Sequence, residues 1–595
     1  MYKLFVKNKI DPCYYRISQI ISIIVFILLP FLYGYKMETG MEKVDLYFFW
    51  IIGMFAWFRL QINAFDRVAI LLGTLLLLAV STAIFHSTTD VNSSKILITL
   101  FFSFSIFCYI RSHPSVSDNI SWIIVPSLFC QLSLGYWQFV RFNAEPLMIK
   151  GSLFNSGYFA NWLAPCALLL LGYLCMNSDR SKRNLLLSRF GLYILFFATV
   201  FLLFATQARA ALLGCLAGSI FILWIHCRIK YQRQWKVWFT VVTSFVVITI
   251  CAWFFMIKQN SAIGRLTIYE VTWHMIRDHL FLGVGSNRFQ AYYNIYQAQH
   301  FQSAVSQLEV KQLAGNTFEA FNFILQWWAE YGLISIIGGG FFFYFFIREC
   351  VKLTQKENKI SPQQSYIAAS ICLFCSGLFS NPFHCSATFL LFISLLASMG
   401  RYDRIRDKQS KLSNARYFSI FLKVPCIILS IYFLYFGMQQ WNAEIQWKRA
   451  SSFARFGSIE LAKPLYAEAY KKLKNDGRFL YNYGTELAQA NEYDLSLPML
   501  ERASLYYASS NLSMYLGLDY FYTGNYKAAE RSFLDASYTV PSALLPKYQL
   551  VQLYLKTKRK ADARRWISYT LSYPIKIKDE ISDKIIEELK AIHLE

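Results

Sequence analysis

The chain has 595 residues, of which 55% are hydrophobic, 18% aromatic and only 16% charged. This composition excludes a soluble globular protein of ordinary make-up. A formal net charge of +23 would suit a nucleic-acid-binding protein, but the positive residues gather in loops between apolar segments, where they set membrane topology. We therefore expect no nucleic-acid partner.

Apolar runs long enough to cross a bilayer, about 17–25 residues each, recur as far as residue 436. We count thirteen, at 17–35, 45–63, 68–86, 95–111, 119–141, 157–177, 189–206, 210–228, 236–257, 322–348, 364–379, 384–400 and 416–436. The first lacks a small-residue cleavage site, which favours a retained span over a signal peptide. The sequence predicts an all-α polytopic membrane domain over residues 1–436.

Basic residues cluster in alternate loops of this domain. The clusters are Arg180, Lys182, Arg183 and Arg189; Arg228, Lys230, Arg233 and Lys236; Arg348, Lys352, Lys356 and Lys359; and Arg401, Arg404, Arg406, Lys408 and Lys411. Loops rich in Lys and Arg stay cytoplasmic. The rule predicts a cytoplasmic N-terminus, with the loops 142–156, 206–209, 258–321 and 379–384 and everything after 436 on the outer side.

The first polar motif on the outer side is Gly151-Ser-Leu-Phe-Asn155-Ser-Gly-Tyr-Phe-Ala-Asn161, which opens a membrane helix. The N–H groups of a helix start can receive an anion; the alternative is a plain helix start capped by Asn155 or Ser156. Arg209 follows between two spans. An arginine this close to hydrocarbon needs a partner or a water-filled cavity, unless it snorkels to the interface.

The loop 258–321 is the one stretch of this domain with room for a sizeable extramembrane structure. It holds Arg265 near its start, then an amphipathic stretch through Arg277 to Gly283-Val-Gly285, and it leads into Asn322-Phe-Ile-Leu-Gln-Trp-Trp-Ala-Glu330-Tyr-Gly332. Guanidinium groups bind phosphate oxygens bidentately. Arg209 and Arg265 on one side of the membrane would therefore suit a diphosphate.

The sequence gives no sign of a metal or cofactor site. Thirteen cysteines lie along the chain, mostly within spans, and read as small buried hydrophobes. No His, Cys or carboxylate cluster has metal-ligand spacing, and no Gly-rich phosphate loop occurs. We expect neither a metal nor a cofactor.

After residue 436 the composition becomes that of a soluble protein and a repeat of about 34 residues appears. Its blocks begin at Gly457, Asn491, Gly524 and Thr557. Each reads as a turn followed by the second helix of a hairpin, which resembles tetratricopeptide repeats. We expect an α-solenoid over residues 437–595 that docks a protein partner or drives assembly rather than catalysing a reaction.

The motifs of residues 120–400 together resemble the O-antigen ligase superfamily, which includes O-antigen ligases, O-antigen polymerases and protein O-oligosaccharyltransferases. The resemblance rests on the Gly151–Asn155 run, the Arg209 and Arg265 elements, and Asn322-x-x-Leu325 with Glu330 and Gly332. It implies a GT-C-like, metal-independent, inverting glycosyltransferase of the bacterial inner membrane. Such an enzyme transfers a glycan from undecaprenyl diphosphate to a hydroxyl-bearing acceptor, namely lipid A, a protein or a growing polysaccharide, at the outer, periplasmic face.

One residue departs from the family pattern. The family usually has His immediately before the Asn of the last motif, where this chain has Phe321, and phenylalanine cannot accept a proton. Another residue supplies the base, or no strong base is needed, or the protein is inactive. The candidate substitutes are Glu319, Glu330, His300 and His384.

The residues expected at the site follow from these motifs. Arg209, Arg265, Glu319 and Glu330 are the catalytic candidates, and Asn155, Asn161, Asn322, Arg277 and His384 are the substrate-binding candidates. The leading hypothesis is a glycosyltransferase. The alternatives are a catalytically degenerate membrane scaffold whose repeats recruit envelope partners, and a lipid-linked-sugar transporter, which would need more ionisable residues within its spans.

Overall fold

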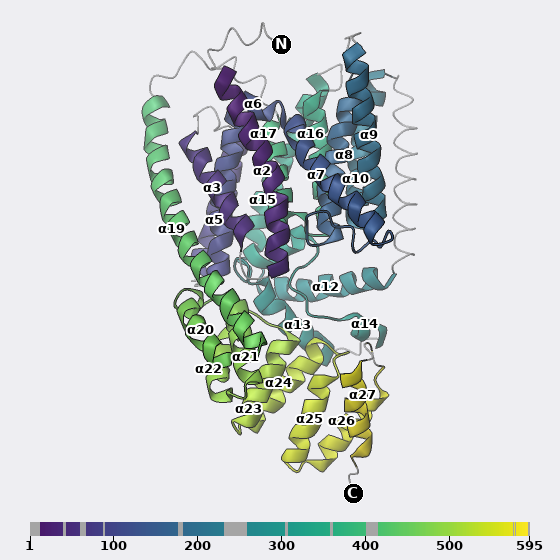
Figure 1. Ribbon diagram of the computed structural model, residues 1–595, viewed down its shortest axis with the longest axis vertical. Coiled ribbons are helices and arrows are strands. Elements are labelled where there is room, and N and C mark those ends of the chain that lie inside the picture. Colours follow the sequence, from purple (N-terminus) through teal and green to yellow (C-terminus); the bar gives the residue numbers. More distant parts are fainter. Residues whose placement is uncertain are drawn as a thin grey trace.

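The computed structural model describes residues 12–39, 43–59, 67–86, 90–176, 183–230, 259–303, 308–356, 361–399, 415–574, 576 and 579–592. All regular secondary structure in these ranges is helical, which confirms the expected all-α class. Figure 1 shows an upper bundle of long helices, a thin middle layer and a lower array of short helices that ends at the C-terminus.

Twelve helices of the upper bundle overlap twelve of the thirteen expected spans. They are α2 (Pro12–Thr39), α3 (Val44–Phe58), α4 (Arg67–Phe85), α5 (Val91–Ser112), α7 (Ile120–Arg141), α8 (Ser156–Cys175), α9 (Arg183–Ala205), α10 (Arg209–Lys230), α15 (Phe323–Lys356), α16 (Pro362–Gly377), α17 (Ser386–Ser398) and α19 (Ala415–Arg455). The short α6 (Pro114–Ser117) joins α5 to α7. The run 236–257 lies outside the described residues. Seven described helices are long and apolar enough to cross a membrane, so the count of thirteen remains a prediction.

Small residues let the central helices α8, α10 and α16 approach one another closely, as is common between helices in membranes. A Cβ atom added at Gly172 of α8 would lie 1.9 Å from the Ser365 hydroxyl of α16. One added at Gly214 of α10 would lie 2.3 Å from the carbonyl oxygen of Cys372. This packing holds α8 and α10 against α16, and Asn155 and Arg209 lie at the starts of α8 and α10.

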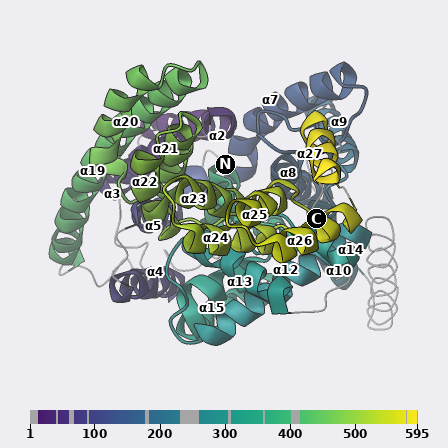
Figure 2. The same ribbon diagram turned by 90° about the horizontal axis from the view of Figure 1, so that it is seen from below.

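The middle layer is the structured part of the long loop. Helix α12 (Gln259–Asp278) lies across the lower end of the bundle, followed by α13 (Phe289–Ser303) and α14 (Leu308–Leu313) (Figures 1 and 2). The layer has its own core, in which Val271, Met275 and Tyr293 are fully buried together with Ala329 of α15. The loop is therefore a packed unit attached to the start of α15.

The lower array contains α20 (Ile459–Leu473), α21 (Gly477–Gln489), α22 (Tyr493–Ser504), α23 (Ser510–Tyr522), α24 (Tyr526–Thr539), α25 (Leu545–Lys556), α26 (Lys560–Ser572) and α27 (Glu580–Ala591). The turns at Gly457, Asn491, Gly524 and Lys558 each place that residue at positive φ, so the same backbone turn recurs with the period of the sequence repeat. The assignment to tetratricopeptide repeats remains a prediction. Helix α19 runs without a break through residue 436 into this array.

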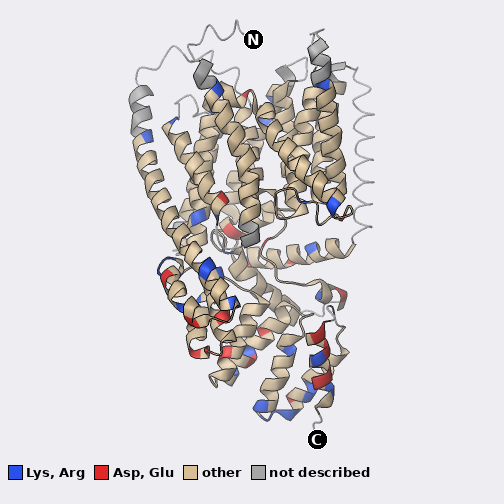
Figure 3. Ribbon diagram, viewed as in Figure 1, with Lys and Arg blue, Asp and Glu red and all other residues tan. Residues whose placement is uncertain are grey.

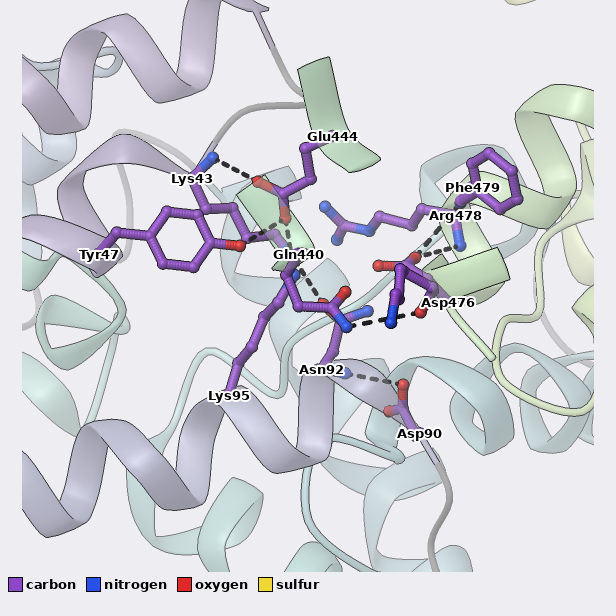
Figure 4. Close-up of polar contacts among 11 residues, drawn as sticks. Lys43, Tyr47, Asp90, Asn92, Lys95, Gln440, Glu444, Asp476, Arg478 and Phe479 are labelled. Carbon is purple, nitrogen blue, oxygen red and sulfur yellow. Dashed lines mark hydrogen bonds and ion pairs between the residues drawn. The ribbon is translucent and has the colours of Figure 1, made fainter. Parts of the chain in front are cut away.

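A buried polar network joins the bundle to the lower array (Figure 4). Glu444 of α19 accepts hydrogen bonds from Lys95 Nζ at 2.6 Å, the Lys43 backbone N–H at 3.0 Å and the Tyr47 hydroxyl at 3.2 Å. Asp476 caps α21 beside it. Burial raises the pKa of Asp476, but the charges of Lys43 and Lys95 and hydrogen bonds from the Phe479 N–H and the Asn92 side chain together lower the pKa below its ordinary value. Elsewhere the bundle shows few charged residues compared with the lower array (Figure 3).

Candidate functional site

Two arginines from different elements lie close together at the lower end of the bundle. Arg209 is the first residue of α10, and its Nη2 donates to the Ser261 hydroxyl of α12 at 3.0 Å. Arg265 follows one turn later on α12. Burial lowers the pKa of Arg265, Tyr269 opposes that shift, and the positive charge of Arg209 lowers it further. An arginine stays protonated in a protein, so the two guanidinium groups create a local positive field that favours an anion.

Phe321 lies beside Arg265. The Arg265 Cζ lies 5.8 Å from the centre of the Phe321 ring, within the range of a cation–π interaction. Phe321 has a φ of 50° and its side chain is 37% exposed, an uncommon conformation for a bulky residue that often marks a functional site. The Tyr269 hydroxyl donates to the carbonyls of Phe321 at 3.4 Å and Leu378 at 3.3 Å. Tyr269 thus ties α12, α15 and α16 together at this point.

The asparagines expected to bind substrate have structural partners. The Asn322 Oδ1 accepts from the N–H groups of Ile324 at 3.0 Å and Leu325 at 3.1 Å, so it caps α15. Asn155 caps α8 through the N–H of Gly157. Both caps fix helix starts at the lower end of the bundle, and satisfy N–H groups that an anion would otherwise use.

Asn161 lies inside the bundle and joins α8 to α16. Its Oδ1 accepts from the Ser376 hydroxyl, and its Nδ2 donates to the Ser380 hydroxyl at 3.4 Å. The residue is buried. These contacts give Asn161 a positioning role for the turn that leads to the short helix η2 (Pro382–His384).

Glu319 and His384, two of the candidate substitutes for the missing histidine, face each other. The Glu319 Oε1 lies 3.6 Å from the His384 Nε2, and its Oε2 accepts from the Asn381 Nδ2 at 3.3 Å. The His384 ring stacks near Tyr158 of α8, with 6.5 Å between ring centres. His384 is 47% exposed and Glu319 22%, so solvent reaches the pair. A carboxylate beside an imidazole stabilises the imidazolium that forms when histidine accepts a proton.

Glu330 is buried in the joint between the loop and α15. Its Oε1 accepts from the Gln326 Nε2 at 2.8 Å and its Oε2 from the Asn287 N–H at 3.1 Å. With both oxygens engaged and the side chain 7% exposed, Glu330 is placed to hold the loop rather than to meet an acceptor hydroxyl.

Two glycines complete this joint. Gly332 interrupts α15 with a φ of 73° and a ψ of −177°, and a Cβ there would lie 2.1 Å from the Phe281 carbonyl oxygen. Gly283 has a φ of 67°, and its Cβ would lie 2.5 Å from the Glu330 carbonyl. The N–H of Leu333 donates to the Leu280 carbonyl at 2.8 Å. Only glycine tolerates such an approach in this conformation, which explains the Gly283 and Gly332 motifs.

Two further candidates lie apart from the arginine pair. Arg277 is exposed on the last turn of α12, about 18 Å along the helix axis from Arg265 at 1.5 Å per residue. His300 lies near the end of α13, where its ring is 6.3 Å from that of His274. Tyr269, Ser261, Asn381 and Tyr158 were not among the residues expected at the site, because their contacts with other elements depend on the fold.

The apolar helices define a multi-pass membrane protein, with its polar candidate site at one end of the bundle. Residues 194–338 match the model of the O-antigen ligase family, a narrower range than the resemblance at residues 120–400. The match supports glycan transfer of the ligase or polymerase kind, a lipid-linked glycan donor and membrane association. The matched range holds Arg209, Arg265, Arg277, Glu319, Asn322 and Glu330, whereas Asn155, Asn161 and His384 lie outside it. A comparison with curated proteins found no match.

Proposed function

We propose that this chain transfers a glycan from undecaprenyl diphosphate to a hydroxyl-bearing acceptor on the outer, periplasmic side of the bacterial inner membrane. The observation that carries the proposal is that Arg209 binds Ser261, one helical turn before Arg265 on α12, within the range that matches the O-antigen ligase family. Arg265 forms no ion pair with a carboxylate among the described residues, so its charge remains available for a diphosphate.

In the proposed reaction the acceptor oxygen attacks the anomeric carbon from the face opposite the diphosphate. The bond from that carbon to the acceptor forms as the bond to the phosphate oxygen breaks, which inverts the configuration. Arg209 and Arg265 stabilise the negative charge that develops on the departing undecaprenyl diphosphate. The acceptor proton passes to His384, and Glu319 stabilises the resulting imidazolium. No step requires a metal ion or a cofactor.

The decisive experiment measures release of undecaprenyl diphosphate from a native lipid-linked glycan by the purified protein. Arg265→Ala should abolish measurable release, whereas Arg265→Lys should retain part of it, because lysine keeps the charge but loses the bidentate geometry. Arg348→Ala is the matched control, since Arg348 is exposed near the opposite end of α15. Equal release by wild type and Arg265→Ala would overturn the proposed role of the arginine pair.

A second experiment tests the Glu319–His384 pair. His384→Gln should lower turnover by about 10²–10⁴-fold, the usual contribution of general-base catalysis, while binding of the lipid-linked donor stays as in wild type. Unchanged turnover would show that this pair is not the base.

The alternative is a membrane scaffold without catalysis, which Phe321 favours because it cannot act as a base. Folded wild-type protein that releases no undecaprenyl diphosphate from native donor, in the presence of native acceptor, would support the scaffold. The acceptor class (lipid A, protein or polysaccharide) would then no longer be in question. Capture of a protein partner by residues 437–595 would be the next measurement.

A further inference from the structure

A cluster of potential metal ligands lies in the middle layer, about 7.5 Å from Arg265 along the axis of α12 at 1.5 Å per residue. Glu270 and His274 are four residues apart on α12, so they share one face of that helix, and His300 approaches them from α13. One ligand atom from each side chain lies within 4.8 Å of the other two. Because His300 comes from another helix, sequence spacing alone did not reveal the cluster.

The three side chains surround a common point without bonding to one another. Within the part of the chain that the structure describes, none of them takes part in a side-chain hydrogen bond or an ion pair. The rings of His274 and His300 are tilted by 41°, and the Phe301 ring lies 5.1 Å from the His300 ring. Glu270 and His274 are exposed and His300 is half-buried, so an ion can enter from solvent.

We propose that Glu270, His274 and His300 bind one Zn²⁺ ion, with water as the fourth ligand. Two imidazoles and one carboxylate form a known zinc ligand set, with bonds of about 2.0–2.2 Å. Ligand atoms on a tetrahedral zinc ion with such bonds are about 3.4 Å apart, so ligand atoms that now lie within 4.8 Å of one another must approach by up to about 1.4 Å. Ca²⁺ and Mg²⁺ prefer oxygen ligands, and the two imidazoles therefore select a late transition metal.

The position of the cluster indicates what the ion does. Glu270 lies on the same helix as Arg265, whereas α13 is held by the lower array. The Asn294 Nδ2 donates to the Ala508 carbonyl at 2.7 Å, and the Gln297 Nε2 donates to the Thr539 carbonyl at 2.6 Å. A zinc ion between α12 and α13 thus links the helix that carries the site arginine to the repeat helices. This role is structural and does not depend on the proposed glycan transfer.

The test is binding of Zn²⁺ alone to the tag-free, full-length protein in detergent at about pH 7.5, where ordinary histidines are neutral. Wild type should bind one equivalent of Zn²⁺ at this site, and Co²⁺ in its place should give the visible absorption of a tetrahedral complex. His274→Gln and His300→Gln should each raise the Kd for Zn²⁺ at least about tenfold. Removing a residue that only hydrogen-bonds a metal ligand already lowers metal affinity by about 10–100-fold, and these variants remove the ligand itself. His226→Gln, which removes an exposed histidine of α10, and Glu309→Gln on α14 are the matched controls.

A thermal shift separates loss of the metal from loss of the fold. Zn²⁺ should raise the melting temperature of wild type and of both controls, because a ligand that binds only the folded state stabilises it. The shift should vanish in His274→Gln and His300→Gln, while their metal-free melting temperatures stay near that of metal-free wild type. Absence of Zn²⁺ binding by wild type, or equal affinity in the two histidine variants, would overturn the proposal.

Discussion

The buried pair between Lys95 and Glu444 offers the sharpest test of how the bundle holds the lower array. The side chains are 3% and 1% exposed and 2.6 Å apart. Lys95→Met keeps most of the side-chain volume but leaves the Glu444 carboxylate with the Lys43 N–H and the Tyr47 hydroxyl as its remaining donors. Removing one partner of a buried ion pair costs about 3–5 kcal/mol. We expect that loss to appear as local opening of the junction.

Amide hydrogen exchange measures that opening residue by residue. A loss of about 3 kcal/mol corresponds to an exchange rate roughly 100-fold faster, at 1.4 kcal/mol for each factor of ten. The increase should be confined to residues 43–47 and 440–455. Lys352→Met is the matched control, because Lys352 pairs with Glu349 at the surface with its side chain 51% exposed, and such pairs contribute about 0–1 kcal/mol.

The double variant Lys95→Met, Glu444→Gln identifies the cause. A neutral glutamine at 444 still accepts from the Lys43 N–H and the Tyr47 hydroxyl and carries no charge, so most of the protection should return. Unchanged exchange in Lys95→Met would refute the view that this pair secures the junction. Exchange in the double variant as fast as in the single one would show that packing, not charge, is responsible.

Three further predictions concern the site and the lower array. Phe321→His should raise the rate of glycan transfer, measured as undecaprenyl diphosphate release, because it places an imidazole beside Arg265; a lower rate would show that the Phe321 ring is itself required. Gly332→Ala should expose the loop to limited proteolysis, since it adds a Cβ in a backbone conformation that costs about 1–3 kcal/mol for other residues; undiminished resistance would contradict the proposed joint. Burial raises the pKa of Asp519 to about 7, above its unfolded value of about 3.9. Between about pH 4 and 7 the Asp519 carboxyl is therefore protonated in the folded state and ionised in the unfolded state. The melting temperature of the lower array in the full chain should therefore fall as the pH rises from about 4 to 7 and stay level above, and Asp519→Asn should remove this dependence.

Much of the architecture could be predicted because apolar length and turn residues are local properties of the sequence. The helix starts at Asn155 and Asn322 and the turns at Gly457, Asn491 and Gly524 follow from such signals. Arg209 and Arg265 could be placed on one side of the membrane from the order of the spans alone. The proximity of Arg209 and Arg265 could not be predicted, because it depends on how α12 lies across the bundle.

Contacts between residues far apart in the chain could not be predicted from the sequence. Glu319 and His384 were each candidates for the base, but nothing in the sequence indicated that they face each other. Glu330 was a catalytic candidate because of its motif, and the sequence did not indicate that Gln326 and Asn287 would bind its two carboxylate oxygens. The Lys95–Glu444 pair joins positions 349 residues apart and has no local signature.

The unbroken course of α19 has a mechanical consequence. A helix of 41 residues is a rod of about 60 Å at 1.5 Å per residue, with its upper part packed in the bundle and its lower part in the repeat array. Bending it within one of its packed segments would break backbone hydrogen bonds, so the array cannot swing freely as it would on a flexible tether. A molecule held on the repeat helices would therefore sit at a set height above the membrane surface. The length of α19 would therefore set the distance between the membrane domain and any molecule bound to the repeat helices.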